Sequence, residues 1–242
     1  MPNITDRPSP NFDDRAAGVP VDILILHYTG MTSAEAALAR MCDPAAKVSA
    51  HYCIAEDGTC TRLVDEAKRA WHAGVSAWAG ARDINGRSIG IELVNPGHEF
   101  GYRPFPEAQM DRLIGLCRDI LGRHPIPPER VLGHSDVAPL RKQDPGELFD
   151  WPRLAAAGIG LWPSAVASVP VPPVAEAQAM LGRYGYDVPA SGALDAATRA
   201  VLVAFQRHFR PRDVSGTLDG ETAARLLALL RLVDAGPVRP YV

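Results

Sequence analysis

The sequence lacks any apolar run long enough to cross a membrane as a helix. Its densest run, residues 23–26, has four residues, against the roughly 18 that a membrane helix needs. Residues 1–6 contain no basic segment followed by an apolar stretch, so they do not resemble a secretory leader. We therefore expect a cytoplasmic protein without a membrane span. A periplasmic protein whose leader had been removed would begin in the same way.

An excess of charge of one sign is also missing. The 242 residues carry 25 Lys/Arg and 28 Asp/Glu, a net charge of −3, so no nucleic-acid partner is expected. None of the four cysteines forms a CxxC pair, which argues against a zinc cluster held by cysteines. Cys53 and Cys60 flank a hairpin signal, but we expect free thiols because no secretion signal accompanies them.

Strand and helix signals alternate through the first two thirds of the chain. The sequence is 47% hydrophobic, which is enough for a substantial core. The predicted elements are strands at 21–28, 88–94 and 130–133, a hairpin at 50–64, and amphipathic helices at 33–41 and 106–122. Strands mixed with helices predict an α/β (α+β) fold with a mixed central sheet flanked by helices.

Proline marks a boundary in the last third of the chain. The Pro-rich segment 163–173 predicts an extended linker between a domain at 1–162 and a second domain at 174–242. The second domain contains a near-repeat with an offset of 24 residues, and each copy supplies a glycine turn and an aspartate suited to cap a helix. It therefore predicts a small three-helix bundle, with Phe205 in its core and His208 at its surface.

Two histidines and one aspartate follow predicted strands of the first domain. His27 ends the strand at 21–28, and His134 follows the strand at 130–133, with Asp144 ten residues further on. Strand ends are where α/β folds collect functional groups. Two imidazoles and a carboxylate can hold zinc and leave a position for water, whose pKa zinc lowers to about 7. Because no short-range motif such as HExxH is present, structural histidines are the alternative.

Glu92 is a carboxylate inside the apolar strand at 88–94. Such a group is costly to bury unless it is paired or used. Strand alternation puts Glu92 and Gly90 on one face, with room for a substrate beside the glycine. This predicts a general base near the zinc site. Lys142, two residues before Asp144, could stabilise a developing oxyanion; a solvated position is the alternative for both side chains.

Six segments of the first domain occur in an order that is specific when taken together. They are Leu26-His27-Tyr28-Thr29, Ser49-Ala50-His51-Tyr52, Ala70-Trp71-His72-Ala73-Gly74, Ser88-Ile89-Gly90-Ile91-Glu92, Gly133-His134-Ser135-Asp136-Val137 and Lys142-Gln143-Asp144-Pro145-Gly146. This set resembles the zinc-dependent N-acetylmuramoyl-L-alanine amidases of the AmpD and AmiD type. The resemblance implies a zinc cofactor with His27, His134 and Asp144 as ligands. It also implies Glu92 as the catalytic acid/base and Lys142 as a transition-state stabiliser.

The second domain resembles the three-helix peptidoglycan-binding domain through residues 204–211 and 215–219. Together the two resemblances imply hydrolysis of the amide bond between N-acetylmuramic acid, or its 1,6-anhydro form, and L-alanine of the stem peptide. The expected partners are peptidoglycan fragments or anhydro-muropeptides. A non-catalytic peptidoglycan-recognition protein and a peptidoglycan endopeptidase are the alternatives. The oligomeric state and wall binding by the second domain stay open.

Further residues in these segments are candidates for substrate contact. We predict that His51, Trp71 and Asn85 bind substrate. His72 is expected to line the site or to support its ligands, and the same alternative applies to His51. Trp78 could stack on a sugar, although tryptophans more often pack in cores.

Overall fold

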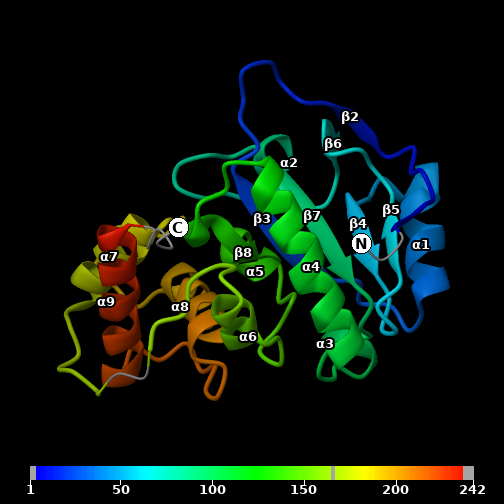
Figure 1. Ribbon diagram of the computed structural model, residues 1–242. Coiled ribbons are helices and arrows are strands. Elements are labelled where there is room, and N and C mark those ends of the chain that lie inside the picture. Colours follow the sequence, from blue (N-terminus) through cyan, green and yellow to red (C-terminus); the bar gives the residue numbers. More distant parts are fainter. Residues whose placement is uncertain (1–3, 165–166, 237–242) are drawn as a thin grey trace, which may run out of the picture.

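The computed structural model describes residues 4–164 and 167–236, so residues 165–166 of the predicted linker and both chain ends lie outside the described part. Its centre is a mixed six-stranded sheet in the order β1-β5-β4-β7-β3-β8 (Figure 1). The strands are β1 (Ile4–Asp6), β3 (Ile23–Tyr28), β4 (Tyr52–Ile54), β5 (Cys60–Arg62), β7 (Ser88–Leu93) and β8 (Val131–Gly133). The β4–β5 hairpin is antiparallel and the other neighbours are parallel. The predicted mixed sheet is confirmed.

A smaller sheet forms beside the main one. It pairs β2 (Phe12–Asp14) with β6 (Lys68–Ala70) in antiparallel register. The N-terminal segment that carries β1 and β2 thus runs along the β4–β5 side of the molecule (Figure 1). It also supplies Arg15, whose guanidinium donates to the carbonyl oxygens of Glu66, Asn85, Gly86 and Ser88. Arg15 therefore connects this segment to α2 (Ile84–Arg87) and to the start of β7.

The register of β3 and β7 brings the candidate site residues together. It places Ile25 beside Gly90 and His27 beside Glu92. Because paired residues of neighbouring strands share a face, His27 and Glu92 project from the same face. The pairing of β3 with β8 ends just before His134. The carboxyl ends of three parallel strands therefore deliver these side chains to one edge of the sheet.

One face of the sheet is apolar and covered by helices. The long helix α4 (Glu107–Arg123) crosses this face (Figure 1), and α6 (Trp151–Ala156) packs beside it. Leu26 and Ile91 of the sheet belong to the same buried cluster as Leu113 of α4. Burying a side chain of this kind contributes about 1.5–3 kcal/mol. This face anchors the strands on which the site is built.

The opposite face carries His27 and Glu92 and is covered in part by shorter elements. On it, α1 (Ala34–Cys42) packs against Cys53 of β4, and the Ser33 hydroxyl caps the helix by accepting from the Ala36 N–H. The remaining short elements are α2 (Ile84–Arg87), α3 (Gly97–Phe100), α5 (His134–Val137), η1 (Pro44–Ala46) and η2 (Pro128–Arg130). The helix predicted at 33–41 is therefore confirmed, with a serine cap.

The C-terminal third folds into three helices, as predicted. They are α7 (Val174–Tyr184), α8 (Ala196–Phe209) and α9 (Gly220–Ala235), on the left in Figure 1. The repeated aspartates, Asp195 and Asp219, cap α8 and α9, because each side chain accepts from the backbone N–H three residues on. The near-repeat of the sequence is thus a repeated helix start.

These three helices share a hydrophobic core with the sheet. One buried cluster joins Ile25 and Trp78 of the first part to Phe205 of α8. Trp78 lies so close to Gly185 that a Cβ there would be 2.5 Å from the indole Cε2 atom, and Gly185 has a φ of +140°, which favours glycine. The boundaries at 1–162 and 174–242 stay a prediction, since the packing is continuous across them.

Several predictions for single residues have a clear outcome. Phe205 is fully buried, as expected, and Trp78 is a core residue. The surface position predicted for His208 is wrong: this residue is 3% exposed, and its ring stacks on Trp151 at 3.7 Å between centroids. The imidazole is tolerated there because its Nδ1 has a hydrogen-bond partner, the carboxylate of Asp136.

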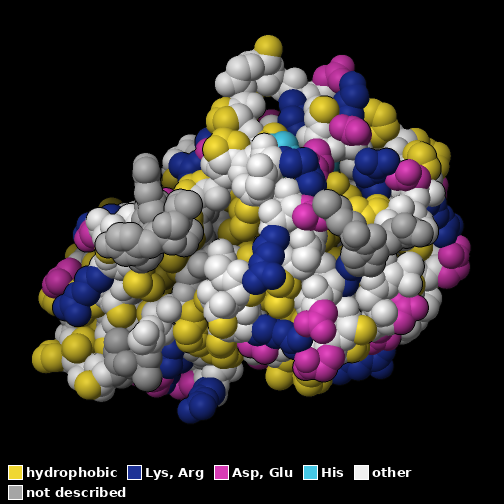
Figure 2. All heavy atoms as spheres, in the orientation of Figure 1, with side chains coloured by type: hydrophobic (Ala, Val, Ile, Leu, Met, Phe, Trp, Pro, Cys, Tyr) yellow, Lys and Arg dark blue, Asp and Glu magenta, His cyan; other side chains and the backbone are white. Residues whose placement is uncertain are grey.

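The remaining sequence expectations concern thiols, membranes and charge. All four cysteines are free, as expected. In the part of the chain that the structure describes, no helix is both long and apolar enough to cross a membrane. Figure 2 shows basic and acidic side chains interspersed over one face of the molecule.

Candidate metal centre

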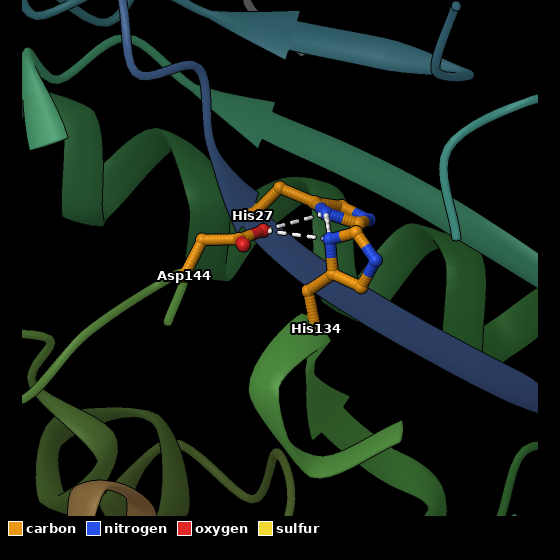
Figure 3. Close-up of side chains that lie close together, drawn as sticks. All are labelled: His27, His134 and Asp144. Atoms are coloured by element: carbon orange, nitrogen blue, oxygen red, sulfur yellow. Dashed lines mark hydrogen bonds and ion pairs between the residues drawn. The ribbon is translucent and has the colours of Figure 1, made fainter. Parts of the chain in front are cut away.

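Three buried side chains meet at the edge where β3 and β8 end. His27 comes from β3, His134 begins α5, and Asp144 lies in the loop that follows (Figure 3). His27 Nδ1 lies 2.9 Å from Asp144 Oδ2 and 3.0 Å from His134 Nδ1. His134 Nδ1 and Asp144 Oδ2 are 3.0 Å apart. The three predicted ligands therefore form one small triangle of atoms that could hold a metal ion.

A chain of hydrogen bonds fixes the tautomer of His27. The Ser88 hydroxyl donates to the Ile84 carbonyl at 2.7 Å, so its oxygen is left to accept from His72 Nε2 at 3.2 Å. A neutral His72 then accepts at Nδ1 from His27 Nε2, 3.1 Å away. His27 therefore carries its proton on Nε2, and its Nδ1 lone pair points into the triangle.

His134 has the same tautomer through a different partner. Its Nε2 lies 3.0 Å from the backbone oxygen of Ala73, which can only accept, so Nε2 carries the proton. Asn85 holds this backbone in place, because its Oδ1 accepts from the N–H groups of His72 at 3.1 Å and Ala73 at 2.8 Å. Both imidazoles thus present unprotonated Nδ1 atoms.

The surroundings of His27 and Asp144 give these two side chains the charge states that metal ligands need. It lowers the pKa of His27 to about 4, and the neighbouring His134 ring adds to this effect. Burial alone would raise the pKa of Asp144, but the facing His134 and His27 rings outweigh it and hold the pKa below its usual range. At neutral pH the site therefore offers a neutral imidazole and an ionised carboxylate, the forms that bind metals.

The donor set fits zinc. Two nitrogen lone pairs and a carboxylate oxygen about 3 Å apart repel one another, and a cation between them reverses that repulsion. Two imidazoles and one carboxylate are a set of protein ligands found in catalytic zinc sites, where tetrahedral bonds of about 2.0–2.2 Å put ligand atoms about 3.3 Å apart. The triangle would need to open by only about 0.3 Å. The hydrogen bonds on the outer nitrogens match those that orient metal-binding histidines.

A cleft of about 600 Å³ opens beside this triangle, and Glu92 lines it. The Glu92 Oε2 atom is buried, with no hydrogen-bond partner among the residues that the structure describes. Burial raises the pKa of Glu92 well above its ordinary value, Asp144 adds to the rise, and Lys142 offsets part of it. A carboxyl group with a raised pKa beside a cleft is a candidate for proton transfer.

Lys142 lines the same cleft from the loop before Asp144. It is half-buried, and its backbone N–H donates to the Ala138 carbonyl at 3.0 Å, just after α5. The Lys142 charge acts on the pKa of both Glu92 and His27. The ammonium is therefore close enough to influence the charge of any group bound in the cleft.

The three predicted substrate contacts do not line this cleft in the described structure. His51 is 0% exposed, and its Nδ1 accepts from the Gly90 N–H at 3.0 Å. Asn85 is buried, and its Oδ1 accepts hydrogen bonds from the backbone N–H groups of His72 and Ala73. Trp71 is half-buried. His51 and Asn85 therefore hold the backbone behind the site, and direct substrate contact is not supported for either.

The space predicted beside Glu92 belongs to His72 instead of a substrate. A Cβ on Gly90 would lie 2.5 Å from His72 Cγ, so the glycine admits the imidazole that fixes His27. His72 lines the cleft, whereas its neighbour His51 lies behind it. The signal for this was a glycine inside a buried strand, which marks close approach of another group.

Comparison with known proteins agrees with this geometry. Residues 17–147 match the N-acetylmuramoyl-L-alanine amidase family, and residues 171–226 match a peptidoglycan binding domain. The N-acetylmuramoyl-L-alanine amidase AmiD of Escherichia coli K12 is 41% identical in an alignment that covers 89% of this chain and 84% of that protein.

Two solved structures are similar over nearly the whole chain. E. coli AmiD in complex with its substrate, anhydro-N-acetylmuramic acid-L-Ala-D-gamma-Glu-L-Lys, has a TM-score of 0.80 at 37% identity, covering 91% of this chain and 97% of that one. AmpDh3 from Pseudomonas aeruginosa in complex with anhydromuramic pentapeptide has a TM-score of 0.79 at 34% identity, covering 98% and 100%. With this site geometry and these similarities, the chain belongs to the N-acetylmuramoyl-L-alanine amidase family.

Proposed function

We propose that this enzyme hydrolyses the amide bond between N-acetylmuramic acid, or its 1,6-anhydro form, and L-alanine of peptidoglycan stem peptides. Zinc is the proposed cofactor, held by His27 Nδ1, His134 Nδ1 and Asp144 Oδ2. The observation that carries the proposal is the triangle of unprotonated ligand atoms, 2.9–3.0 Å apart, beside a cleft that also holds the Glu92 carboxyl group.

When bound, zinc supplies a Lewis acid for a carbonyl oxygen and lowers the pKa of water to about 7. The protein contributes the placement of the ligands. His72 and the Ala73 carbonyl fix the outer nitrogens of the two histidines, so the imidazoles do not have to reorient. Asp144 supplies the one negative charge of the ligand set. The other face of the site opens into the cleft, where a substrate carbonyl can approach.

Glu92 is proposed as the acid/base residue. Its buried Oε2 has no partner in the described structure and is free to accept a proton from the attacking water. The raised pKa of Glu92 then suits delivery of that proton to the amine of L-alanine as it leaves. A carboxylate with an ordinary pKa would be a weaker donor at neutral pH.

Lys142 is proposed to stabilise the oxyanion that forms as water adds to the carbonyl. Its ammonium belongs to the cleft lining together with Glu92 and Asp144. A fixed positive charge in a partly dry site stabilises developing negative charge more strongly than it would in water. Lys142 thereby complements the proton transfer assigned to Glu92.

The proposed substrate class also rests on the relatives. The two solved structures contain anhydromuropeptides, and the cleft of this chain presents both charged and aromatic side chains. Arg40, Arg141 and Glu99 supply charges, and Tyr28 and Phe100 supply rings. A muropeptide has both a charged peptide and a sugar face, so the cleft chemistry suits it. The cytoplasmic location expected from the sequence stays a prediction.

The test is a digest of purified sacculi and of soluble anhydro-muropeptides, each with and without a chelator, with products read by mass spectrometry. We expect free stem peptide, abolished by the chelator and restored by zinc. Preference for the soluble substrate would support recycling in the cytoplasm, and preference for sacculi would support wall remodelling. Products cut within the stem peptide would indicate an endopeptidase instead. No cleavage by zinc-bound protein would indicate a recognition protein.

A further inference from the structure

We propose that Tyr186 and His208 of the C-terminal part are positioning residues of the metal centre and that they act through Asp136. These three side chains are called the Asp136 lock. The inference rests on the zinc site proposed above. It assigns the C-terminal helices a role in shaping the site, separate from any binding to the wall.

Asp136 is a buried carboxylate with donors from both parts of the chain. Its side chain is 0% exposed. Asp136 Oδ1 accepts from the Tyr186 hydroxyl at 2.6 Å. Asp136 Oδ2 accepts from His208 Nδ1 at 2.7 Å and from the Gly133 N–H at 2.8 Å. Two of the three donors therefore come from beyond the predicted linker.

The same carboxylate holds the turn that carries the metal ligands. By accepting from the Gly133 N–H, Asp136 closes the first turn of α5, where His134 is the first residue. The next residue, Ser135, donates its N–H to the Asp144 carbonyl at 2.9 Å. A shift of this turn would therefore move one ligand directly and a second through the backbone.

The C-terminal donors are held rigidly against the first part of the chain. The Tyr186 ring lies 4.9 Å from Trp78, and the His208 ring stacks on Trp151 at 3.7 Å. Both belong to elements joined by hydrophobic packing across the two parts. Because a packed core does not deform continuously, a rigidly held donor fixes the position of the carboxylate that it contacts. The lock thus couples the C-terminal helices to the spacing of the ligand triangle.

The test uses Tyr186→Phe, which keeps the ring and removes one donor to Asp136. Tyr184→Phe is the matched control. Tyr184 is also buried and packs on Trp78 at 5.4 Å, but it makes no hydrogen bond to Asp136 in the described structure. For the full-length wild type and both variants, zinc affinity is measured by competition with a chromogenic chelator. Hydrogen exchange at residues 133–138 and the unfolding midpoint are measured in chelated protein.

We expect Tyr186→Phe to weaken zinc binding about tenfold, the size typical for loss of a group that orients a ligand. Exchange at 133–138 should become faster, and Tyr184→Phe should change neither property. His208→Leu removes the second donor and should weaken zinc binding further. His208→Asn, whose amide nitrogen can occupy the place of Nδ1, should restore part of the affinity. This rescue separates positioning from a general loss of stability.

Each remaining outcome is decisive. If Tyr186→Phe and His208→Leu bind zinc like the wild type, the proposal is overturned, even if their unfolding midpoints fall. If the wild type itself binds no zinc, the proposed function fails separately. Hydrogen exchange in chelated protein then decides whether the lock holds the α5 turn, and unchanged exchange in Tyr186→Phe overturns the proposal.

Discussion

Two carboxylates of this protein have opposite surroundings. Asp136 lies at the junction with the C-terminal helices and accepts three hydrogen bonds at 2.6–2.8 Å. Glu92 lies at the cleft, and its buried Oε2 has no partner in the described structure. A satisfied carboxylate stabilises the fold, whereas an unsatisfied one costs stability. The comparison therefore separates a carboxylate assigned to the structure from one proposed for the chemistry.

The electrostatic consequence of this difference is specific to Glu92. Burial raises its pKa well above the ordinary value, with Asp144 adding to the rise. Asp144, the carboxylate proposed as a metal ligand, is more fully buried, but its histidine partners hold its pKa below the usual range. Within one site, two carboxyl groups are thus tuned in opposite directions, which is the pattern expected for a proton carrier beside a metal ligand.

Removing a ligand should have the largest effect. We expect His134→Ala to lose both bound zinc and amidase activity, a loss beyond the ~10²–10⁴-fold that removal of an acid/base group costs. Elemental analysis and the muropeptide digest measure the two properties. His124→Ala is the control, because His124 pairs with Glu66. Full zinc content in the His134 variant would rule out its role as a ligand.

Glu92→Gln should have the next largest effect. The amide keeps the size of the side chain but cannot carry the proton, so we expect kcat to fall about 10²–10⁴-fold while zinc stays bound. Steady-state kinetics and metal analysis on the same sample check this. A variant that retained most of its turnover would show that another group moves the proton.

Lys142→Met should follow. It keeps a long side chain and removes the charge, so we expect kcat to fall about 10²–10³-fold with little change in zinc content. The control is Lys68→Met, since Lys68 is an exposed residue paired with Asp14. If Lys142→Met changed KM and left kcat unaltered, the residue would bind the ground state and not the oxyanion.

Asp136→Asn tests the other carboxylate of the comparison. Because Asn brings an N–H group into a site that already holds three donors, we expect the free energy of unfolding to fall by about 3 kcal/mol. Urea unfolding measures it. The control is Asp187→Asn, which breaks an exposed ion pair with Arg82 and should cost at most about 1 kcal/mol. Equal losses in both variants would refute the structural role of Asp136.

The smallest effect is a pH dependence in metal-free protein. The pKa of Glu92 is raised in the folded state, so its protonation favours folding below the ordinary value of 4.5. That contribution is lost as pH rises toward the folded pKa. Glu92→Gln has no such loss, so its stability relative to the wild type should grow as pH rises above 4.5. Urea unfolding in chelator across this range checks it, and a constant difference would contradict it.

Much of the fold and the proximity of the proposed ligands could be predicted from the sequence, because both depend on local patterns. Strand periodicity located β3 and β7, and the aspartate caps located α8 and α9. His27 and His134 directly followed strand signals. Parallel strands bring their carboxyl ends to one edge, so their proximity followed from the predicted topology.

What the sequence did not predict depends on contacts between distant segments. His72 and His51 occupy similar motifs, yet His72 lines the cleft and His51 lies behind it. The His72 ring occupies the space where a Cβ of Gly90 would lie, whereas the His51 ring accepts a hydrogen bond from the Gly90 backbone N–H. His208 looked like a surface residue because its partner, Asp136, lies 72 positions earlier in the chain. No local pattern encodes such pairings.

The most direct test of this account compares Glu92→Gln and Asp136→Asn side by side. Turnover of anhydro-muropeptide, zinc content and the unfolding midpoint are measured for both variants and the wild type. The account predicts that Glu92→Gln loses turnover, keeps zinc and loses no stability. It predicts that Asp136→Asn has a lower unfolding midpoint than the wild type. If Glu92→Gln had a lower unfolding midpoint than the wild type, or kept its turnover with zinc bound, the separate roles assigned to the two carboxylates would be contradicted.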